Sequence, residues 1–366
     1  MKKIYYITAV FATLFLVGCG DGIDLPGVNV ETDLNKIPLP DNNVNLEQVE
    51  LKPSTEPMLH EGLHTEEDFQ RIRDKKAAGE EPWVSAYQLL VESQFSQKTA
   101  DTYPTEWIKR GISGDENYMN AARGATIVYQ QALRWKIEQD DEYAAKAVEN
   151  LNKWVQTCVG VTGNTNLSLA AGLYGYEFAI AGELLRDYGG WDRADFAAFQ
   201  NWLLKVFYPA NDDFLKRHHD TNALHYWANW CLCNIAAKMA IGIVTDRRDI
   251  YNEGIAHLQT GDTNGRLRRA IYHDYAPDYN FAQWQESGRD QGHTLMCVGL
   301  MGIICQLAWS QGDDFFAYDD NLFLRACEYA ACCNYTNETV PYTTYIWQKQ
   351  SQWGYPIPEE QTTLGG

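Results

Sequence analysis

The chain has 366 residues, of which 45% are hydrophobic and 22% charged, and this composition is typical of a globular protein with a large core. Its formal charge of −19 at pH 7 argues against nucleic acid as a partner, because phosphate binding needs a basic surface. It does not exclude a polyanionic ligand, since the local potential of a site matters more than the total charge. The chain is rich in Trp (12) and Tyr (22), whose rings suit sugar stacking as well as helical cores.

The N-terminus has the form of a bacterial export signal. Lys2 and Lys3 precede an apolar run at residues 4–17, which is too short to span a membrane comfortably. Gly18 then stands before Cys19, and this resembles a lipobox, which implies cleavage before Cys19 and lipidation of that residue. We therefore expect an exported protein in the periplasm or outer membrane, attached to the membrane only through a lipid anchor.

Composition divides the chain into three segments. Residues 1–19 are the expected signal peptide and lipobox. Residues 20–57, rich in Asp, Asn, Pro and Gly without periodicity, are the expected flexible tether, and residues 58–366 are the expected folded domain. Most cysteines of that domain lie in apolar helical patterns and lack the paired spacing of zinc ligands, so we expect no metal and no cofactor.

Helical periodicity dominates the folded domain. Thr65-Glu-Glu-Asp68 has the form of a capping box that opens a first helix, and Pro82 stands in the first turn of a second. Further apolar-periodic segments are joined by mostly short connections, and no intervening stretch has the alternation of a strand. The pattern predicts an all-α fold, an (α/α) toroid or incomplete barrel of helical hairpins. The expected helices are 65–78, 82–95, 117–139, 142–158, 167–188, 193–207, 222–243, 247–258, 290–311 and 321–333.

The helix expected from residue 222 opens with polar and aromatic groups that a core does not need. At about 3.6 residues per turn, Asn222, His225, Tyr226 and Asn229 fall on one face. An amide, an imidazole and a phenol can hold and deprotonate a sugar acid, so Asn222 and His225 are catalytic candidates, and Tyr226 and Trp227 are binding candidates. The structural alternatives are a core histidine for His225 and a helix cap for Asn222.

Two longer connections, 96–116 and 259–289, interrupt the helices, and long ordered loops on a rigid scaffold are where binding groups belong. The second supplies two catalytic candidates, Tyr272 and Arg269. The structural alternatives are a solvated basic face for the arginines and an anchoring role for the tyrosine rings. The binding candidates of the two connections and the turn that follows are Arg266, Arg268, His273, Tyr275, Trp284, Gln285, Arg289, His293, Lys109 and Arg110.

These residue types suit β-elimination from a uronic acid. The C5 proton is weakly acidic while the neighbouring carboxylate is negative, so an enzyme must offset that charge, remove the proton and protonate the leaving glycosidic oxygen. An amide or an arginine that is hydrogen-bonded to the carboxylate lets negative charge spread into it as the proton leaves. A neutral His or an ionised Tyr can be the base, and a Tyr hydroxyl can be the acid, so the reaction needs no metal.

Several runs together resemble the alginate lyase superfamily, in particular its lipoprotein members from Bacteroidetes. They are Tyr226-Trp-Ala-Asn-Trp230, Arg266-Leu-Arg-Arg-Ala-Ile-Tyr-His273, Gln285-Glu-Ser-Gly-Arg-Asp-Gln-Gly-His293, Thr65-Glu-Glu-Asp-Phe-Gln-Arg-Ile-Arg73, Gly79-Glu-Glu-Pro-Trp83 and Ala170-Ala-Gly-Leu-Tyr-Gly-Tyr-Glu-Phe178. The similarity covers about residues 58–365. It implies an (α/α) toroid and eliminative cleavage of a β-1,4-linked polyuronate such as alginate, so the expected partner is an acidic polysaccharide.

The resemblance transfers the catalytic tyrosine but not the whole site. The superfamily has this tyrosine in an Arg-containing run that ends Tyr-His, which here is Tyr272-His273. Its Asn-His pair falls on Ala223 and Leu224, so that pair is missing, and the flanking Asn222 and His225 are candidates to replace it. The substrate-carboxylate arginine of the superfamily falls on Arg266, Arg268 or Arg269.

Two further interpretations remain open at this point. One is a surface lipoprotein that binds a glycan without cleaving it. The other is a glycoside hydrolase on the same toroid, which needs two carboxylic acids facing one bond; Asp220, Glu286 and Asp290 are the candidates. Relatives of this shape continue through at least one more helix, so the sequence is also compatible with a C-terminal truncation. Nothing in the sequence predicts an oligomeric state.

Overall fold

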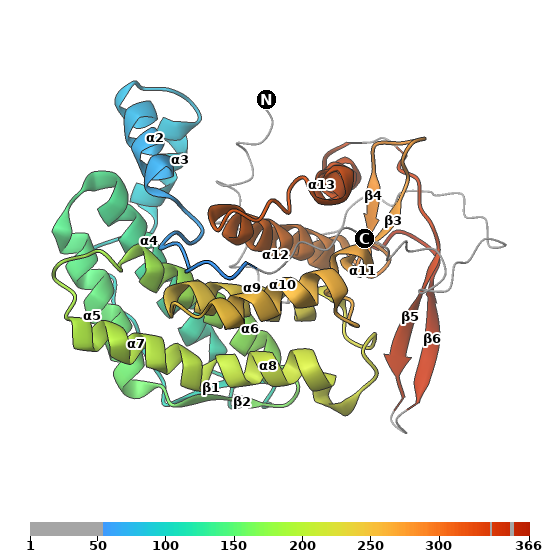
Figure 1. Ribbon diagram of the computed structural model, residues 1–366, viewed down its shortest axis with the longest axis horizontal. Helices are drawn as coiled ribbons and strands as arrows, with labels where there is room; N and C mark the ends of the chain where they lie inside the picture. Colours follow the sequence, from blue (N-terminus) through green and yellow to red (C-terminus); the bar gives the residue numbers. More distant parts are fainter. Residues whose placement is uncertain (1–53, 337–338, 352–354) are drawn as a thin grey trace.

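The computed structural model describes residues 54–336, 339–351 and 355–366, and this part of the chain is mostly helical (Figure 1). The expected signal peptide, the lipidation site Cys19 and nearly all of the expected tether lie outside the described residues. Four helical hairpins form the body. They are α4 (Tyr118–Glu138) with α5 (Asp141–Thr157), α6 (Leu167–Leu184) with α7 (Arg193–Val206), α9 (Ala228–Val244) with α10 (Arg248–Thr260), and α12 (Gln291–Ser310) with α13 (Tyr318–Tyr335).

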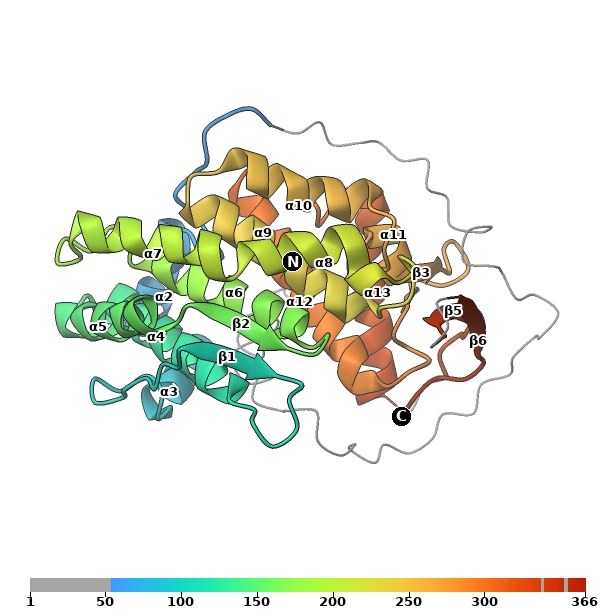
Figure 2. The ribbon, with the colours of Figure 1, turned by 90° about the horizontal axis from the view of Figure 1, so that it is seen from below.

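The first helix of each hairpin belongs to an inner layer. Helix α6 packs between α4 and α9, and α9 packs in turn against α12. The second helices lie outside, and Figure 2 shows α7 and α8 (Tyr208–Arg217) running across the face of the molecule in front of the inner helices. A further hairpin, α2 (Glu66–Ala77) and α3 (Trp83–Glu92), packs on α4.

The inner helices run in the same direction, because each is followed by an outer helix that returns the chain. Their first residues, Tyr118, Leu167, Ala228 and Gln291, therefore lie at one end of the body. We call the loops that precede them the rim: residues 107–117, 160–166, 218–227 and 266–290. Contacts between successive loops support this arrangement, such as the parallel pairing of 107–110 with 160–163. Helices α6 and α9 are apolar on almost every side, which fits a position between an inner neighbour and an outer layer.

Helix α12 is long and apolar enough to cross a membrane by length and composition, and just over half of that stretch is buried. It packs between α9 and α13, as the core helix of a toroid does. Polar caps begin several of the helices. Thr65 and Asp68 form the predicted capping box, and Asp140, Asp192 and Asp290 accept hydrogen bonds from the first turns of α5, α7 and α12.

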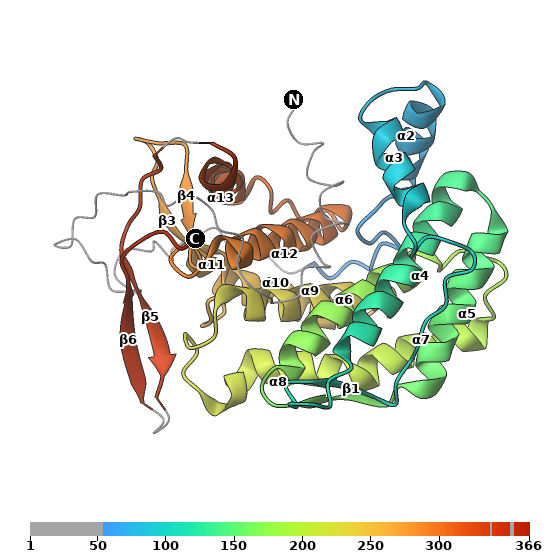
Figure 3. The same ribbon diagram turned by 180° about the vertical axis from the view of Figure 1, so that it is seen from behind.

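The prediction that the connections contain no strands is wrong. Within the described ranges there are three two-stranded ribbons: β1 (Trp107–Arg110) with β2 (Gly160–Gly163), β3 (Ile271–Asp274) with β4 (Ala282–Trp284), and β5 (Tyr345–Gln350) with β6 (Pro356–Gln361). Their strands have three to six residues, which is too short for a period-two pattern to stand out from the sequence. Figure 3 shows the β5–β6 hairpin at the edge of the body, below β3 and β4.

The helix predicted from residue 222 begins six residues later, at Ala228. The chain turns sharply before it, because His218, His219 and Asp220 all have positive φ. The side chain of Asn222 then accepts a hydrogen bond from the N–H of Leu224 (3.0 Å), which favours a turn over a helix. Asn222, His225, Tyr226 and Asn229 thus do not form one helical face.

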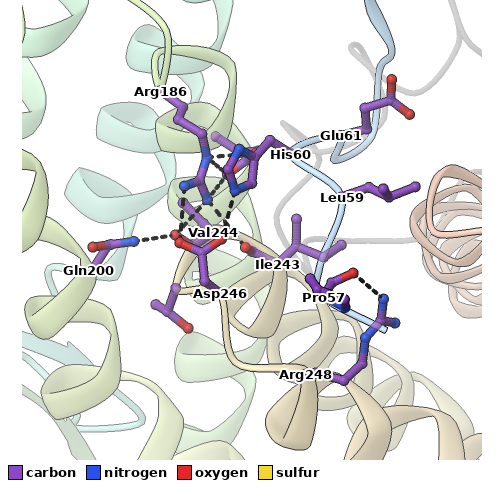
Figure 4. Close-up of polar contacts among 12 residues, drawn as sticks. Pro57, Leu59, His60, Glu61, Arg186, Gln200, Ile243, Val244, Asp246 and Arg248 are labelled. Atoms are coloured by element: carbon purple, nitrogen blue, oxygen red, sulfur yellow. Dashed lines mark hydrogen bonds and ion pairs between the residues drawn. The ribbon is translucent and has the colours of Figure 1, made fainter. Parts of the chain in front are cut away.

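The first described residues cross the end of the body opposite to the rim. His60 contacts Asp246 in the turn between α9 and α10 (3.0 Å), and Arg186, just after α6, contacts the same carboxylate (3.2 Å) (Figure 4). Arg248 donates to the carbonyl of Pro57 (3.0 Å). The segment that follows the expected tether is therefore fixed at the C-terminal ends of α6 and α9.

Candidate active site

One pocket at the rim joins the two segments in which the sequence places the chemistry. It has about 330 Å³ of empty space, counting the part open to solvent. Leu224 contributes from the turn before α9, and the hairpin β5–β6 closes one side. The lining residues are Leu224, Asn264, Arg269, Tyr272, Gln285, Tyr345, Ile346, Trp347 and Gln348.

Tyr272 and Arg269 are thus brought together in one pocket. The ring of Tyr272 packs against Tyr345 with 5.0 Å between centroids, and burial raises the pKa of its hydroxyl to about 12. Arg269 donates from Nη1 to the carbonyl of Asp262 (2.5 Å), which holds the guanidinium at the pocket wall. A protonated phenol and a cation therefore face the same small space.

Two amide side chains shape the same pocket. Asn264 donates to the carbonyls of Leu224 (3.0 Å) and Tyr226 (2.9 Å) and so fixes the turn before α9. Gln285 accepts from the N–H of Ala228 at the start of α9 (3.0 Å). Its Nε2 group has no hydrogen-bond partner in the described part of the chain and is a donor available to a ligand. Asn264 was not among the sequence candidates, although Asn in a long polar loop is a residue that commonly fixes turns.

Asn222 and His225 are not in the pocket, because the β5 strand engages their side chains. Asn222 donates from Nδ2 to the side chain of Gln350 (2.9 Å) and to the carbonyl of Gln348 (3.2 Å). Trp347 stacks on His225 with 5.9 Å between centroids. Residues of β5 therefore contact these two candidates outside the pocket that Tyr272 lines, and the sequence has no local signal of this pairing.

The hydrogen bonds of His225 fix which ring nitrogen carries the proton. Its Nδ1 lies 2.8 Å from the backbone nitrogen of Gln350, and because an N–H group can only donate, Nδ1 must accept. Burial, with a smaller contribution from Lys349, lowers the pKa of His225, so the ring is neutral and its proton sits on Nε2. Nε2 has no partner among the residues described. In this arrangement His225 is a hydrogen-bond donor, and its basic lone pair is occupied.

The candidates around the start of α9 and α12 are packed together. Tyr226 is buried, with its ring 4.7 Å from that of Trp230. Trp227 lies between Trp347 (4.5 Å) and the guanidinium of Arg289 (5.4 Å). The ring of Trp227 is therefore already in contact with protein groups at the rim.

Arg289 and His293 each pair with a neighbouring carboxylate. Arg289 pairs with the buried carboxylate of Glu286 (3.2 Å), and His293 pairs with Asp290 (2.7 Å), which also caps α12. Burial raises the pKa of Glu286, while its Oε1 accepts from the N–H of Asn229 (3.1 Å). These groups hold α9 and α12 together at the rim.

Of the remaining candidates of the second connection, one is a core residue and two are partly buried. Trp284 is fully buried and donates to the carbonyl of Ala326 (2.9 Å), so its prediction as a binding residue is wrong: it is a core residue. Tyr275 donates to Gln283 (2.5 Å), and the His273 ring lies 4.6 Å from that of Tyr275.

The three arginines of the second connection have different surroundings. Arg268 is held by Asp319 and lies 3.9 Å from Asp274, so it belongs to an ion-pair cluster away from the pocket. Burial lowers the pKa of Arg266, and the neighbouring Arg269 adds to this effect. Of the three, Arg269 alone lines the pocket.

The first connection places a cation on the far side of the rim. Lys109 pairs with Asp115 (2.7 Å), whereas the guanidinium of Arg110 lies 4.7 Å above the ring of Tyr118. Arg110 has no ion pair with any residue that the structure describes, and its buried Nη1 has no hydrogen-bond partner there. Within the described ranges, no three His, Cys, Asp or Glu side chains lie close enough together to hold a metal ion.

Comparisons with known proteins place the chain in a family. The family model described as alginate lyase matches residues 73–338, which is well over half of the chain. Among curated proteins, none matches the chain.

Solved structures show the same fold at low sequence identity. A variant of alginate lyase A1-III complexed with a tetrasaccharide superposes with a TM-score of 0.56 and 14% identity, covering 77% of this chain and 82% of that one. The A1-III enzyme from Sphingomonas species A1 gives 0.52 at 14% identity, covering 76% and 80%. An alginate lyase from Bacteroides ovatus gives 0.50 at 14% identity, covering 73% and 82%.

These matches confirm the predicted (α/α) toroid. They support fold alone, while the family rests on the match over residues 73–338. The chain belongs to the alginate lyase family and is a polysaccharide lyase.

Proposed function

We propose that this lyase cleaves alginate or a related β-1,4-linked polyuronate by β-elimination in the pocket that Arg269, Tyr272 and Gln285 line. The observation that carries the proposal is the meeting of a cation, a free amide N–H and a protonated phenol in one place. A tetrasaccharide is bound in solved structures of alginate lyase A1-III variants, which share the fold.

The rim suits an acidic polymer even though the whole chain is negative. The N-terminal ends of four parallel helices point toward it, and each carries about half a positive charge from the aligned peptide dipoles. Arg269 and Arg110 add two cations. Because field strength falls off over roughly 10 Å in salt, these nearby charges outweigh acidic groups on the outer helices.

Arg269 and the Nε2 group of Gln285 bind the carboxylate of the uronate whose C5 proton is removed. Both are donors, so they offset the negative charge that grows on the carboxylate as the C–H bond breaks. Of the predicted arginines, Arg269 is the one with the geometry for this role, and Gln285 supplies the amide that the family's Asn would otherwise give.

Tyr272 is the acid that protonates the leaving glycosidic oxygen. With a pKa of about 12, the phenol is ionised in roughly one molecule in 10⁵ at pH 7, and ionising it costs about 7 kcal/mol. The free-enzyme pocket thus presents an acid. A base role for the same residue requires that the Arg269 cation lower this cost by more than the carboxylate of a bound uronate raises it.

His225 is the alternative base, and it requires a movement of the β5–β6 hairpin. Its ring is neutral and therefore basic, but the N–H of Gln350 occupies the Nδ1 lone pair. Withdrawal of Gln350 would free that lone pair. Asn222 is tied to the same strand residue and would be released with it.

The direct test is incubation of the purified protein with polymannuronate, polyguluronate and glucuronan. Elimination creates a C4–C5 double bond, so the expected result is new ultraviolet absorbance with at least one polymer. Reducing ends without that absorbance would instead indicate hydrolysis, and binding without either product would indicate a glycan-binding protein.

Hydrolysis is less well supported by the carboxylates at the rim. Of the three candidates, Glu286 is buried and bonded to Asn229 and Arg289, and Asp290 caps α12. Asp220 is exposed and pairs with Arg217 (3.3 Å). None of these pairs of carboxyl groups shares the pocket, whereas hydrolysis needs two flanking one bond.

We also propose that the protein is exported and lipid-anchored through Cys19. Residues 57–60 lie at the end of the body opposite to the rim, so the tether expected from Cys19 joins the domain away from the candidate site. Fatty acid bound to the mature protein, and its loss in the variant Cys19→Ala, is the expected result. A mature chain that begins elsewhere would overturn this assignment.

A further inference from the structure

Beyond its first residue, helix α6 is closed to solvent along its length except at one position. From Ser168 to Leu184 every residue is buried apart from Glu177. The residues that pack against the outer layer, such as Gly175 against Phe207 and Gly182 against Phe199, lie on the other side of the helix. Glu177 therefore points to the inner side of the toroid, and its carboxyl group marks the place where that interior remains accessible.

The Glu177 carboxyl group has no protein partner in the described part of the chain. Its Oε2 atom is buried without a hydrogen bond, and no ion pair reaches it. A buried acid normally has such a partner, because desolvating an unpaired charge is costly. Here burial raises the pKa of Glu177 to about 8, so the group is a neutral carboxylic acid, and a hydrogen-bond donor, at pH 7.

An aromatic wall connects this acid to the rim. Arg110 lies over Tyr118, and the Tyr118 ring stacks on Tyr174 at 6.5 Å with an interplanar angle of 11°. Tyr174 lies one helical turn before Glu177 on α6. Both Arg110 and Glu177 influence the pKa of Tyr174, so the three groups are close in space. The wall thus has an unpaired cation at its upper end and an unpaired acid below it.

The depth of the wall is set by helix geometry. Glu177 is ten residues beyond Leu167, the first residue of α6, which corresponds to about 15 Å at 1.5 Å per residue. Facing it on α4 is Tyr129, whose hydroxyl is held by His64 (2.6 Å). Glu177 influences the pKa of Tyr129, so this hydroxyl, held by the segment before α2, lies near the carboxyl group.

We propose that the wall from Arg110 to Glu177 is a second uronate-binding site inside the toroid, in which the carboxyl group of Glu177 donates a hydrogen bond to the carboxylate of a bound uronic acid. This inference rests on the proposed function and names a further position that the polymer occupies. A carboxylate is the ligand that fits best, since an O–H···O⁻ bond is roughly twice as strong as one between neutral groups.

Binding at this site depends on pH through Glu177. A bound carboxylate favours the protonated acid and is repelled by the ionised one, so affinity should fall as pH rises through about 8. Burial lowers the pKa of His64 to about 4 and raises the pKa values of the other neutral neighbours, so they keep one charge state between pH 6 and 9. These neighbours are Tyr129, Tyr174, Tyr176 and Cys233. The charged groups that act on members of the wall are Arg110 on Tyr174 and Asp68 on His64, and both keep their charge over this range, since the pKa of Asp68 is lowered.

The test measures binding of oligouronates by calorimetry between pH 6 and 9, in the Tyr272→Phe background so that substrate is not consumed. With Glu177 intact, the dissociation constant should rise about tenfold between pH 7.5 and 9. The added change Glu177→Gln keeps a neutral donor and should remove this dependence, and Glu177→Ala should weaken binding at pH 6.5. Oligomers whose carboxylates have been reduced to alcohols should bind with no such dependence.

Glu183→Gln is the matched control, because Glu183 is also a buried acid of α6 but pairs with Arg186 at the other end of the helix. It should keep the pH dependence of the parent. Equal pH profiles for the parent and the Glu177→Gln variant would overturn the second site. Release of unsaturated products by the wild type would still support the proposed function in that case. If no oligouronate binds and the wild type releases no unsaturated product, both proposals fall.

Discussion

The turn before α9 and the inner wall of α4 and α6 present opposite arrangements of polar groups. In the turn, Asn222 and His225 are engaged by Gln350 and Trp347 of the β5 strand. On the wall, the Arg110 guanidinium and the neutral carboxyl group of Glu177 each have a buried polar atom that no described residue pairs. From residue types alone, the turn is the expected centre of the chemistry. The hydrogen bonds and ion pairs of the structure indicate instead that the groups available to a ligand lie in the pocket and on the wall.

A polar residue indicates a ligand site only when some of its hydrogen-bonding groups or its charge have no protein partner after folding. Buried groups are normally hydrogen-bonded, so a satisfied Asn or His is explained by structure alone. A buried donor or charge without a partner costs free energy, and binding a substrate can recover it. Substitution of single residues can test this distinction.

The largest effect is expected at Tyr272. Replacing it with Phe removes the proton that the leaving oxygen needs, and kcat should fall by about 10²–10⁴ with the fold intact. The measurement is the rate of unsaturated product formation. Tyr275→Phe is the control, because the Tyr275 hydroxyl is used in bonds to Gln283 and Thr343. Comparable losses in the two variants would mean that the pocket is not the reacting site.

The neighbours Arg269 and Arg268 should behave differently although they are adjacent in sequence. Arg269→Ala removes the cation of the pocket and should lower kcat/KM by about 10²–10³, as the loss of a donor to a developing charge does. Arg268→Ala breaks contacts with Asp319 and Asp274 and should lower Tm by a few degrees while KM stays unchanged. If Arg268→Ala proved the more damaging to turnover, the assignment of carboxylate binding would have to move to it.

Arg110 should influence binding more than turnover. Its guanidinium is unpaired and stacked on Tyr118, so Arg110→Ala should raise KM about 10–100-fold with a smaller change in kcat. Lys109→Ala is the control from the same strand, since Lys109 already pairs with Asp115. An unchanged KM in Arg110→Ala would remove the wall from the path of the polymer.

The link between His225 and the β5 strand can be broken at a single N–H group. Gln350→Pro removes that donor, while Gln350→Ala keeps it and loses only the side chain that holds Asn222. The bond favours neutral His225, so its loss should raise the pKa of His225 by up to about one unit, in line with about 1 kcal/mol for a hydrogen bond. Histidine ring signals followed by NMR against pH report the shift, and equal shifts in both variants would assign it to the side chain.

The sequence predicts those structural features that depend on local interactions better than those that depend on contacts between distant segments. The helices of the toroid follow from periodicity and caps within a few residues, because those signals are local. The start of α9 was misplaced since the positive φ values at His218–Asp220 and the hold of Gln350 on Asn222 come from the fold. Trp284 shows the same limit: an aromatic residue in a polar loop became core through the packing of α13.

For the candidate site, the family pattern marks Tyr272 and three arginines but does not distinguish among the arginines. The fold does so, because Arg269 lines the pocket with Tyr272 while Arg268 lies among aspartates. Glu177 lies in the segment 170–178, which resembles the family, but no local sequence signal distinguishes it from a surface glutamate on a helix. Its significance comes from α4 and the segment before α2, which are distant in sequence.

An effect on stability provides an independent check that Glu177 is unpaired. Its pKa is about 8 in the folded protein against 4.5 ordinarily, so between these values the folded chain holds a proton that the unfolded chain has lost. The free energy of unfolding should fall with pH across this window, by at most about 1.4 kcal/mol per unit, and level off above pH 8. Glu177→Gln cannot lose a proton, so its Tm relative to wild type should rise from pH 5 to pH 9 by several degrees. Thermal unfolding at both pH values measures this difference. A constant difference would mean that a protein group pairs with Glu177. The polar groups of the wall would then be satisfied by the protein, as those of the turn are.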